Sequence, residues 1–386
     1  MNVPKLRFPE FHDEWKKVKI SSIVSESKMK TGNIEKYPLW SLTIESGITP
    51  KTDRYERSFL VKKDDNYKIV GPNNYVYNPM NVHLGAIGRN KSGQSISVSG
   101  YYDVFSINNN FYGFYDNYFI SPVMFKKYKL ISTGSLLEKQ RVHYSQFKEL
   151  EIYLPINKEQ EKIGKFFLLL DKKIELQSKK IETLKLFKKG LLNKLINDSN
   201  GYPIKLEKIF NIFAGGTPST SNHDYWNGNI KWIQSGLIQN NIINDNMIKT
   251  SISIEGLKHS SAKLIKPNTT LLAMTGATCG NTAFLTCSAT ANQSVMAFES
   301  SKCNNKYLYY LFQNNKNYIL KFQAGGAQSG INKNSCKNMI FSFPPLEDQN
   351  KIVNVLDAYE NMIILRIKQL NMLKELKKGL MQNMLI

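Results

Sequence analysis

The amino-acid sequence predicts a mixed α/β protein in which two similar globular domains are separated by two long helices. The helices are expected to form an antiparallel coiled coil, in a duplicated, pseudo-twofold architecture. Three observations predict this. The phrase KKGLLNKLI at 188–196 returns as KKGLMQNML at 377–385, at an offset of 189 residues. An apolar heptad pattern precedes and includes both phrases, which is typical of a coiled coil. The segments in front of the two helices also resemble each other.

The first element is a predicted globular domain at residues 1–154. Its runs NYVYN and ISVSGYYDVFSI are rich in β-branched and aromatic residues and are bounded by Gly, Asn and Pro. This composition favours short strands, so we expect a mixed α/β globule here.

Residues 155–197 and 345–386 are the two predicted long helices. PINKEQEK and PPLEDQNK place Pro before the start and acidic residues in the first turn, as helix N-termini prefer. Two amphipathic helices that pack separately are the alternative. If the helices pair, the apolar seam consists of Ile163, Phe167, Leu170, Ile174, Ile181, Leu184, Leu191 and Leu195 in the first helix, and Ile352, Leu356, Tyr359, Ile363, Leu370, Leu373, Leu380 and Met384 in the second.

The remaining element is a second predicted globular domain at residues 198–344. IKWIQSGLI at 230–238 resembles PLWSLTIESGI in the first domain, and LAMTGAT at 272–278 resembles LGAIGRN. TTLLAM and QSVMAF again favour strands. The order globule, helix, globule, helix therefore indicates the duplication of one ancestral unit.

The chain is strongly basic, with a formal net charge of +21. Residues 1–154 and 197–344 each carry a net +7, so the charge is not confined to one tail. Such an imbalance points to polyanionic partners. The alternative is a compositional bias toward Lys, Asn and Ile without functional meaning.

The sequence lacks the motifs that an enzyme of the usual classes needs. It has no phosphate-binding P-loop, no dinucleotide glycine fingerprint, no HExxH and no Asn-Pro-Pro-Tyr-like clamp of amino-methyltransferases. The four cysteines form no CxxC pair, so no metal site is expected. No apolar run is long enough for a signal peptide or a bilayer span, and we expect a cytoplasmic protein without a membrane partner.

Several phrases resemble the specificity subunit of type I restriction–modification systems. They are GGTPSTSNHDYWNGNIKWIQSGLI, GLKHSSAKLIKPNTTLLAMTGATCGNTAFL, ANQSV, FPPLEDQNKI and, in the first half, PKLRFPEFHDEWKKVKI and LWSLTIESGI. The resemblance implies two target recognition domains, at 1–154 and 198–344, each of which recognises one half of a split double-stranded DNA target. It implies that the two helices are conserved spacers.

The same resemblance implies a subunit that is not catalytic and binds no cofactor itself. Its partners are two methyltransferase subunits, which use S-adenosylmethionine to methylate adenine at N6, and restriction subunits, which use ATP and Mg. The sequence leaves one alternative function open: a coiled-coil scaffold that binds RNA or DNA without sequence choice.

Candidate DNA-contacting residues lie in polar, glycine-bounded loops, because Arg, Lys, Asn, Gln, Ser and Thr are the side chains that contact base edges. For GRNKSGQS at 88–95 the alternative is a solvated hairpin turn, and for GGTPSTSN at 215–222 it is a plain turn. The stretches at 138–144 and 325–333 match each other at the offset of 189. The candidates are Arg89, Asn90, Lys91, Gln94, Arg141, His143, Thr217, Ser219, Thr220, Ser221, Thr278, Asn281, Gln328 and Lys333.

Overall fold

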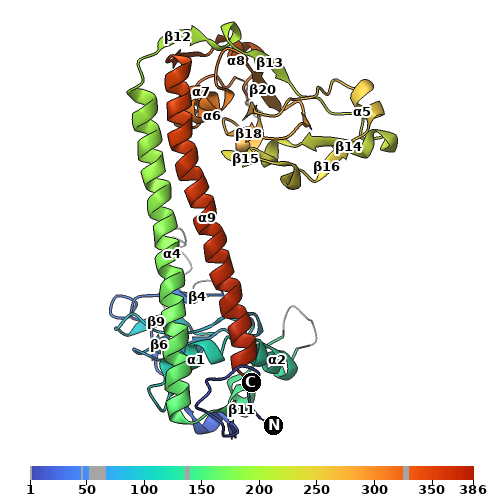
Figure 1. Ribbon diagram of the computed structural model, residues 1–386. Coiled ribbons are helices and arrows are strands. Elements are labelled where there is room, and N and C mark those ends of the chain that lie inside the picture. Colours follow the sequence, from blue (N-terminus) through green and yellow to red (C-terminus); the bar gives the residue numbers. More distant parts are fainter. Residues whose placement is uncertain (1, 45–46, 52–66, 135–139, 325–329) are drawn as a thin grey trace. The chain divides into compact units, whose positions relative to one another are not determined.

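The computed structural model describes residues 2–44, 47–51, 67–134, 140–324 and 330–386 (Figure 1). The chain divides into two compact units. Unit 1 comprises Met1–Lys179 and Ile367–Ile386, and unit 2 comprises Lys180–Arg366. Each unit therefore combines a globular part with segments of both long helices. Within the described ranges, no helix is both long and apolar enough to cross a membrane.

Unit 1 is built on a four-stranded antiparallel sheet with the order β2-β10-β7-β8. A separate antiparallel pair, β1 with β11, brings the start of the domain to the strand that leads into the first long helix. The strands are β1 (Lys16–Lys19), β2 (Val24–Ser27), β3 (Lys30–Thr31), β4 (Trp40–Thr43), β5 (Gly47–Pro50), β6 (Tyr67–Val70), β7 (Tyr75–Tyr77), β8 (Ile87–Arg89), β9 (Ile96–Ser99), β10 (Asp103–Ile107) and β11 (Glu151–Leu154). The short helices are α1 (Tyr112–Tyr118), α2 (Pro122–Ile131) and α3 (Tyr144–Phe147).

The core of unit 1 is aromatic. Phe105 from the central strand β10 lies between Tyr75, Phe119 and Phe147, with ring centroids 5.3–5.7 Å apart. Offset and edge-to-face pairs of this kind add to the burial of apolar area. They explain why the period-two runs of the sequence form strands that bury one face against α1 and α3.

Unit 2 has a five-stranded sheet with the order β13-β20-β17-β18-β15 and a three-stranded sheet β16-β14-β19. The strands are β12 (Tyr202–Lys205), β13 (Asn211–Ala214), β14 (Trp226–Ile233), β15 (Asn241–Ile243), β16 (Thr250–Ile252), β17 (Thr269–Ala273), β18 (Thr282–Leu285), β19 (Thr290–Ala291), β20 (Val295–Glu299) and β21 (Ile340–Phe343). The short helices are α5 (Ile254–Lys258), α6 (Asn305–Asn314), α7 (Lys316–Leu320) and α8 (Lys333–Asn338).

The main sheets of the two units share one strand order. The series β2-β10-β7-β8 in unit 1 corresponds to β13-β20-β17-β18 in unit 2, and the pair β1–β11 corresponds to β12–β21. In both units, short helices follow the last strand of the main sheet and a long helix follows the final strand. The mixed α/β class expected from the sequence is the class observed.

The two long helices are α4 (Asn157–Asn197) and α9 (Leu346–Met384). The fourth residue of each helix is a buried glutamine. The Gln160 amide donates to the Pro155 carbonyl at 2.9 Å, and the Gln349 amide donates to the Pro344 carbonyl at 2.8 Å. These bonds satisfy backbone acceptors just before the helices. Because the same glutamine-to-proline bond forms at the start of each helix, the sequences PINKEQEK and PPLEDQNK are alike.

Each unit contains contacts between α4 and α9. In unit 1, Asp171 contacts Lys377 and Gln177 contacts Gln369, so a rising number in α4 meets a falling number in α9. In unit 2, the Phe187 ring lies 5.3 Å from the Tyr359 ring. Each of the predicted seam residues is buried or partly buried.

Helix α4 passes very close to α1 at a pair of glycines. A Cβ on Gly164 would lie 2.7 Å from the backbone nitrogen of Phe114, and one on Gly113 would lie 3.0 Å from the Gly164 carbonyl oxygen. Backbone atoms cannot swing aside as a side chain does, so this contact requires glycine.

We expect Gly164→Val to destabilise unit 1 by about 1–3 kcal/mol through overpacking, measured by urea unfolding. Gly190→Ala in the same helix is the control. A Cβ on Gly190 meets nothing within 4 Å, so the higher helix propensity of alanine is expected to stabilise the protein by about 0.5–1 kcal/mol. Equal effects at the two positions would contradict the close contact.

Candidate nucleic-acid interface

The loop between β8 and β9 in unit 1 is organised around Asn90. Its side chain is 1% exposed. Its amide nitrogen donates to the carbonyls of Val70, Gly71 and Gln94, at 2.8–3.1 Å. Its oxygen accepts from the backbone nitrogen and the hydroxyl of Ser92. A short amide satisfies the polar backbone of a tight loop in this way.

The prediction that Asn90 contacts DNA does not fit this geometry. The side chain is buried and its polar atoms are engaged inside the loop. Asn90 instead shapes the loop that carries its neighbours. The loop residues 91–94 are exposed, and they include the candidates Lys91 and Gln94.

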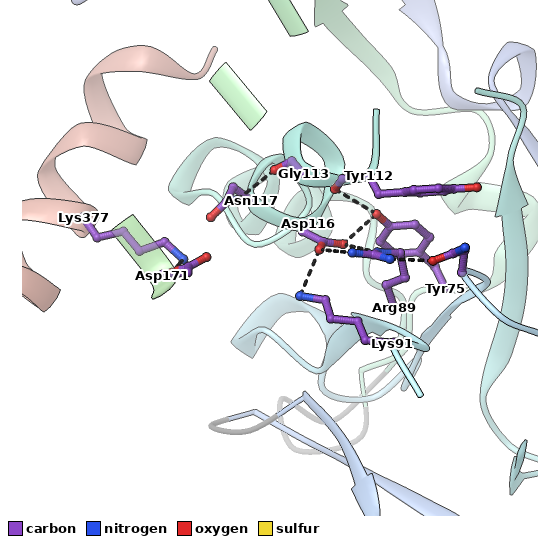
Figure 2. A network of polar contacts seen from close by, with 10 residues as sticks. Tyr75, Arg89, Lys91, Tyr112, Gly113, Asp116, Asn117, Asp171 and Lys377 are labelled. Carbon is purple, nitrogen blue, oxygen red and sulfur yellow. Dashed lines mark hydrogen bonds and ion pairs between the residues drawn. The ribbon is translucent and has the colours of Figure 1, made fainter. Parts of the chain in front are cut away.

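Arg89 is held by Asp116 of α1 (Figure 2). The guanidinium donates to both carboxylate oxygens, at 3.0 and 2.9 Å, and also to the Asn73 side chain at 2.6 Å. Its carbon lies 4.9 Å from the centre of the Tyr112 ring. The Arg89 guanidinium is therefore engaged in contacts inside unit 1. To hydrogen-bond to a base, it would have to break its hydrogen bonds to Asp116.

Asp116 is the centre of this network. Besides Arg89, it accepts from the Tyr75 hydroxyl at 2.7 Å and pairs with the Lys91 ammonium at 2.9 Å. Burial raises the pKa of Asp116, but the hydrogen bonds and positive charges of Arg89 and Lys91 outweigh it and hold that pKa below the ordinary value. The carboxylate is thus ionised at neutral pH and anchors the first residues of the loop.

A cavity of about 460 Å³ lies beside this network in unit 1. Its wall includes Arg89, Lys91, Asp116 and the Asp171–Lys377 pair. Asn117 also lines it. That side chain is 3% exposed, and its nitrogen donates to the Gly113 carbonyl. The cavity places the loop anchor next to the long helices of the same unit (Figure 2).

In unit 2, the predicted loop at 215–222 has a buried base and an exposed tip. A Cβ on Gly215 or Gly216 would lie 2.2–2.3 Å from backbone atoms of neighbouring segments, so the two glycines let the loop begin inside the fold. Its exposed residues are Ser219, Thr220 and Ser221. The Trp226 indole donates to the Ser219 carbonyl at 3.0 Å and fixes the tip.

Three other polar candidates of unit 2 have internal partners. The Thr217 hydroxyl bonds to the Gln293 side chain, and the Thr278 hydroxyl donates to the Ser235 carbonyl at 3.1 Å. Asn281 donates to the Ile238 carbonyl and accepts from Lys316 at 2.6 Å. These three side chains therefore hold loops together. At the exposed tip, the Ser219 and Ser221 hydroxyls bond to each other at 2.8 Å.

Comparison with known proteins shows which proteins this chain resembles. Residues 202–376 match the model of the type I restriction modification DNA specificity domain. This stretch begins at β12 and includes the loop at 215–222. The resemblance found in the sequence is confirmed.

Curated relatives of the chain are specificity subunits. The MjaIX specificity subunit of Methanocaldococcus jannaschii is 27% identical over 186 residues, which cover 47% of this chain and 43% of the relative. The MjaX subunit of the same organism, named as putative, is 22% identical over 270 residues, covering 64% and 61%. The matches thus span less than two thirds of the relatives. They do not favour a scaffold without sequence choice.

Solved structures show the same fold. The type I restriction–modification S subunit from M. genitalium has a TM-score of 0.60 at 14% identity, covering 100% of this chain and 99% of that one. A chain from a study of complex assembly and conformational transition of the type I R-M system has a TM-score of 0.61 at 14% identity, covering 95% and 96%.

The remaining candidates lie near the start of helices that precede the final strand of each unit. Arg141, His143 and Lys333 are exposed. His143 is the N-cap residue of α3, and Lys333 is the first residue of α8, which lies within the matched residues 202–376. Gln328 lies outside the described residues. Among the residues that are described, no cluster of His, Cys, Asp or Glu suits a metal ion.

Sequence reasoning missed Asp116 and Tyr75, which hold the Arg89 loop. Asp116 lies 27 positions from Arg89 and Tyr75 lies 41 positions from Asp116. One signal was available: a single acidic residue inside the aromatic helix FYGFYDNY, where it is costly to bury unless paired.

Proposed function

We propose that the chain is the DNA-recognition subunit of a type I restriction–modification complex. Unit 1 recognises one half of a bipartite, asymmetric double-stranded DNA target, and unit 2 recognises the other. The observation that carries the proposal is the specificity domain at 202–376, together with the same strand order in unit 1. Two exposed polar loops with different sequences, one in each unit, are suited to two different half-sites.

The architecture in this proposal is a duplication with a spacer. Helices α4 and α9 form an antiparallel coiled coil that holds the two target recognition domains apart. The seam burial and the opposite order of contacts in unit 1 support it. One turn of B-DNA is about 34–36 Å long, and the 41 residues of α4 give about 60 Å of helix. A helix of this length can keep the half-sites about one turn apart.

The partners in this proposal are two methyltransferase subunits, which bring S-adenosylmethionine, and restriction subunits, which bring ATP and Mg. The chain itself is not catalytic. The long helices offer an apolar surface for such partners: Leu168, Leu169, Leu176, Leu186 and Phe187 on α4, and Val355, Met362, Ile364, Leu365, Ile367, Met372 and Leu376 on α9 are all exposed. Contiguous exposed apolar side chains are typical of protein interfaces.

A domain replacement tests the function. The chain is co-expressed with its methyltransferase partner in a host that lacks adenine methylation, and the modified sites are sequenced genome-wide. Replacing residues 1–154 by the corresponding domain of another specificity subunit should change one half-site and leave the other unchanged. The proposal fails if both half-sites change, if neither changes, or if the wild type methylates no bipartite sequence.

A further inference from the structure

A salt bridge joins the long helices in each unit. In unit 1, the Lys377 ammonium of α9 lies 2.6 Å from the Asp171 carboxylate of α4. In unit 2, Lys188 of α4 pairs with Glu360 of α9. Lys188 and Lys377 are 189 positions apart, and so are Asp171 and Glu360. The two copies of the repeat thus make the same contact with the roles of the helices exchanged.

We propose that these two salt bridges fix the register of α4 against α9 and so determine the length of unread DNA between the half-sites. This inference rests on the proposed function. It assigns a positioning role to four residues that contact neither DNA nor a reacting atom.

Both lysines are set into the helix pair rather than on its outer surface. The side chains of Lys188 and Lys377 are 13% and 17% exposed. The Lys188 ammonium also lies 5.3 Å from the centre of the Tyr310 ring. An ammonium group at such a position has lost much of its hydration, and removing its carboxylate leaves that loss uncompensated. These positions therefore accept a lysine only when the acid lies opposite.

The apolar seam does not define the register by itself, because a heptad pattern remains matched after a slide of seven residues. The charged positions do distinguish the registers. A seven-residue slide in one direction would place Lys188 opposite Val353 and Lys377 opposite Gly164. In the other direction, the same lysines would face Ile367 and Ser178.

The carboxylates discriminate equally. The two slides would place Asp171 opposite Leu370 or Met384, and Glu360 opposite Ile181 or Leu195. Each slide therefore breaks both salt bridges and sets all four charges against uncharged side chains. A charged residue at a seam position is a known way to specify one alignment at some cost in stability.

The register matters for DNA because each globular part is seated on both helices. In unit 1, Arg7 pairs with Glu159 of α4, and the Tyr118 hydroxyl donates to the Ile386 carbonyl after the end of α9. In unit 2, Lys306 pairs with Asp357 of α9, and Leu192 of α4 lies in the same core. A shifted register would displace the α4 residues that contact each globular part relative to the α9 residues that contact the same part. We expect this displacement to alter the spacing of the half-sites.

The test uses the full chain with its methyltransferase partner and genome-wide sequencing of methylated adenines. Lys188→Glu combined with Lys377→Glu sets like charges together in both units. We expect unchanged half-sites, but the preference for the native spacer over other spacers should fall at least about tenfold, the equivalent of one decade in affinity. The control is Lys165→Glu with Lys351→Glu, since these exposed lysines pair only within their own helices. It should keep the native spacer preference.

Charge exchange separates register from general damage. Adding Asp171→Lys and Glu360→Lys to the double variant restores both pairs with reversed sign and should restore a single spacer. Native spacer preference in the double variant would overturn the inference. If the double variant does not accumulate, the exchange variant decides, and its failure to restore one spacer would overturn the inference. A wild type that methylates no bipartite sequence contradicts the proposed function instead.

Discussion

Replacing Asp116 by alanine is expected to lower the free energy of unfolding of unit 1 by about 3 kcal/mol, because it leaves a buried guanidinium without its carboxylate. The Arg89 side chain is 14% exposed and that of Asp116 is 16% exposed. Hydrogen exchange followed by mass spectrometry is the suitable measurement, since peptides of unit 2 supply an internal reference. Faster exchange is expected in the peptides that contain β7, β8 and α1.

The control for this substitution is Glu149→Ala. Glu149 pairs with Lys19, but both side chains are more than half exposed, and such pairs contribute less than about 1 kcal/mol. In the methylation assay, Asp116→Ala should weaken discrimination at one half-site only. Wild-type exchange rates and an unaltered half-site in Asp116→Ala would show that the network does not position the loop.

The same carboxylate predicts a pH dependence. The folded-state pKa of Asp116 is lower than its ordinary value, so its contribution is complete above the unfolded-state pKa of about 3.9. It is lost as the pH falls through the folded pKa. The stability difference between wild type and Asp116→Ala should therefore be constant near neutrality and shrink below about pH 4.

In the proposed complex, charged substitutions on the exposed apolar surface of the helices are expected to weaken the binding of the methyltransferase subunits. Leu176 and Leu365 are related by the offset of 189, as are Phe187 and Leu376, and all four are more than half exposed. Unit 1 thus carries Leu176 and Leu376, and unit 2 carries the equivalent pair. We expect Leu176→Lys with Leu376→Lys to weaken the binding of one methyltransferase subunit at least about hundredfold.

The expected result is a complex with one methyltransferase subunit instead of two, measured by native mass spectrometry. Changing all four positions should remove both. Leu130→Lys is the matched control, because Leu130 is 84% exposed and belongs to α2, not to a long helix. Unaltered stoichiometry in the fourfold variant would exclude this surface as the docking site.

The long helices were accessible from the sequence because periodicity is a local property of the chain. The predicted ranges differ from α4 and α9 by at most two residues at each end. None of the seam positions is exposed. Heptad spacing alone decides which side of a helix is covered, so no tertiary information was needed.

The site residues were predicted less well, because a side chain's role depends on partners distant in the sequence. Asn90 and Asn281 are of a residue type that often contacts DNA bases. Their side-chain amides instead donate to backbone carbonyls of the same unit. The Asn281 partner Lys316 is 35 positions away. Ser219, Thr220 and Ser221 are exposed as expected, since a Gly-Gly-Thr-Pro stretch forces the chain out of regular structure.

The close approach of Gly164 and Gly113 limits how these domains can be exchanged. In the second repeat, the position that corresponds to Gly164 is Val353, which is buried. The two helices therefore differ at the position that packs against their globular domain. Helix α4 has a glycine without a side chain there, and α9 has the branched side chain of valine. A donor domain joined at residue 154 has to pack against Gly164 of α4. We therefore expect only donors with a small residue at the position of Gly113 to pack correctly. Whether a foreign domain can replace residues 1–154 thus depends on Gly164, which lies ten residues beyond the junction and inside helix α4.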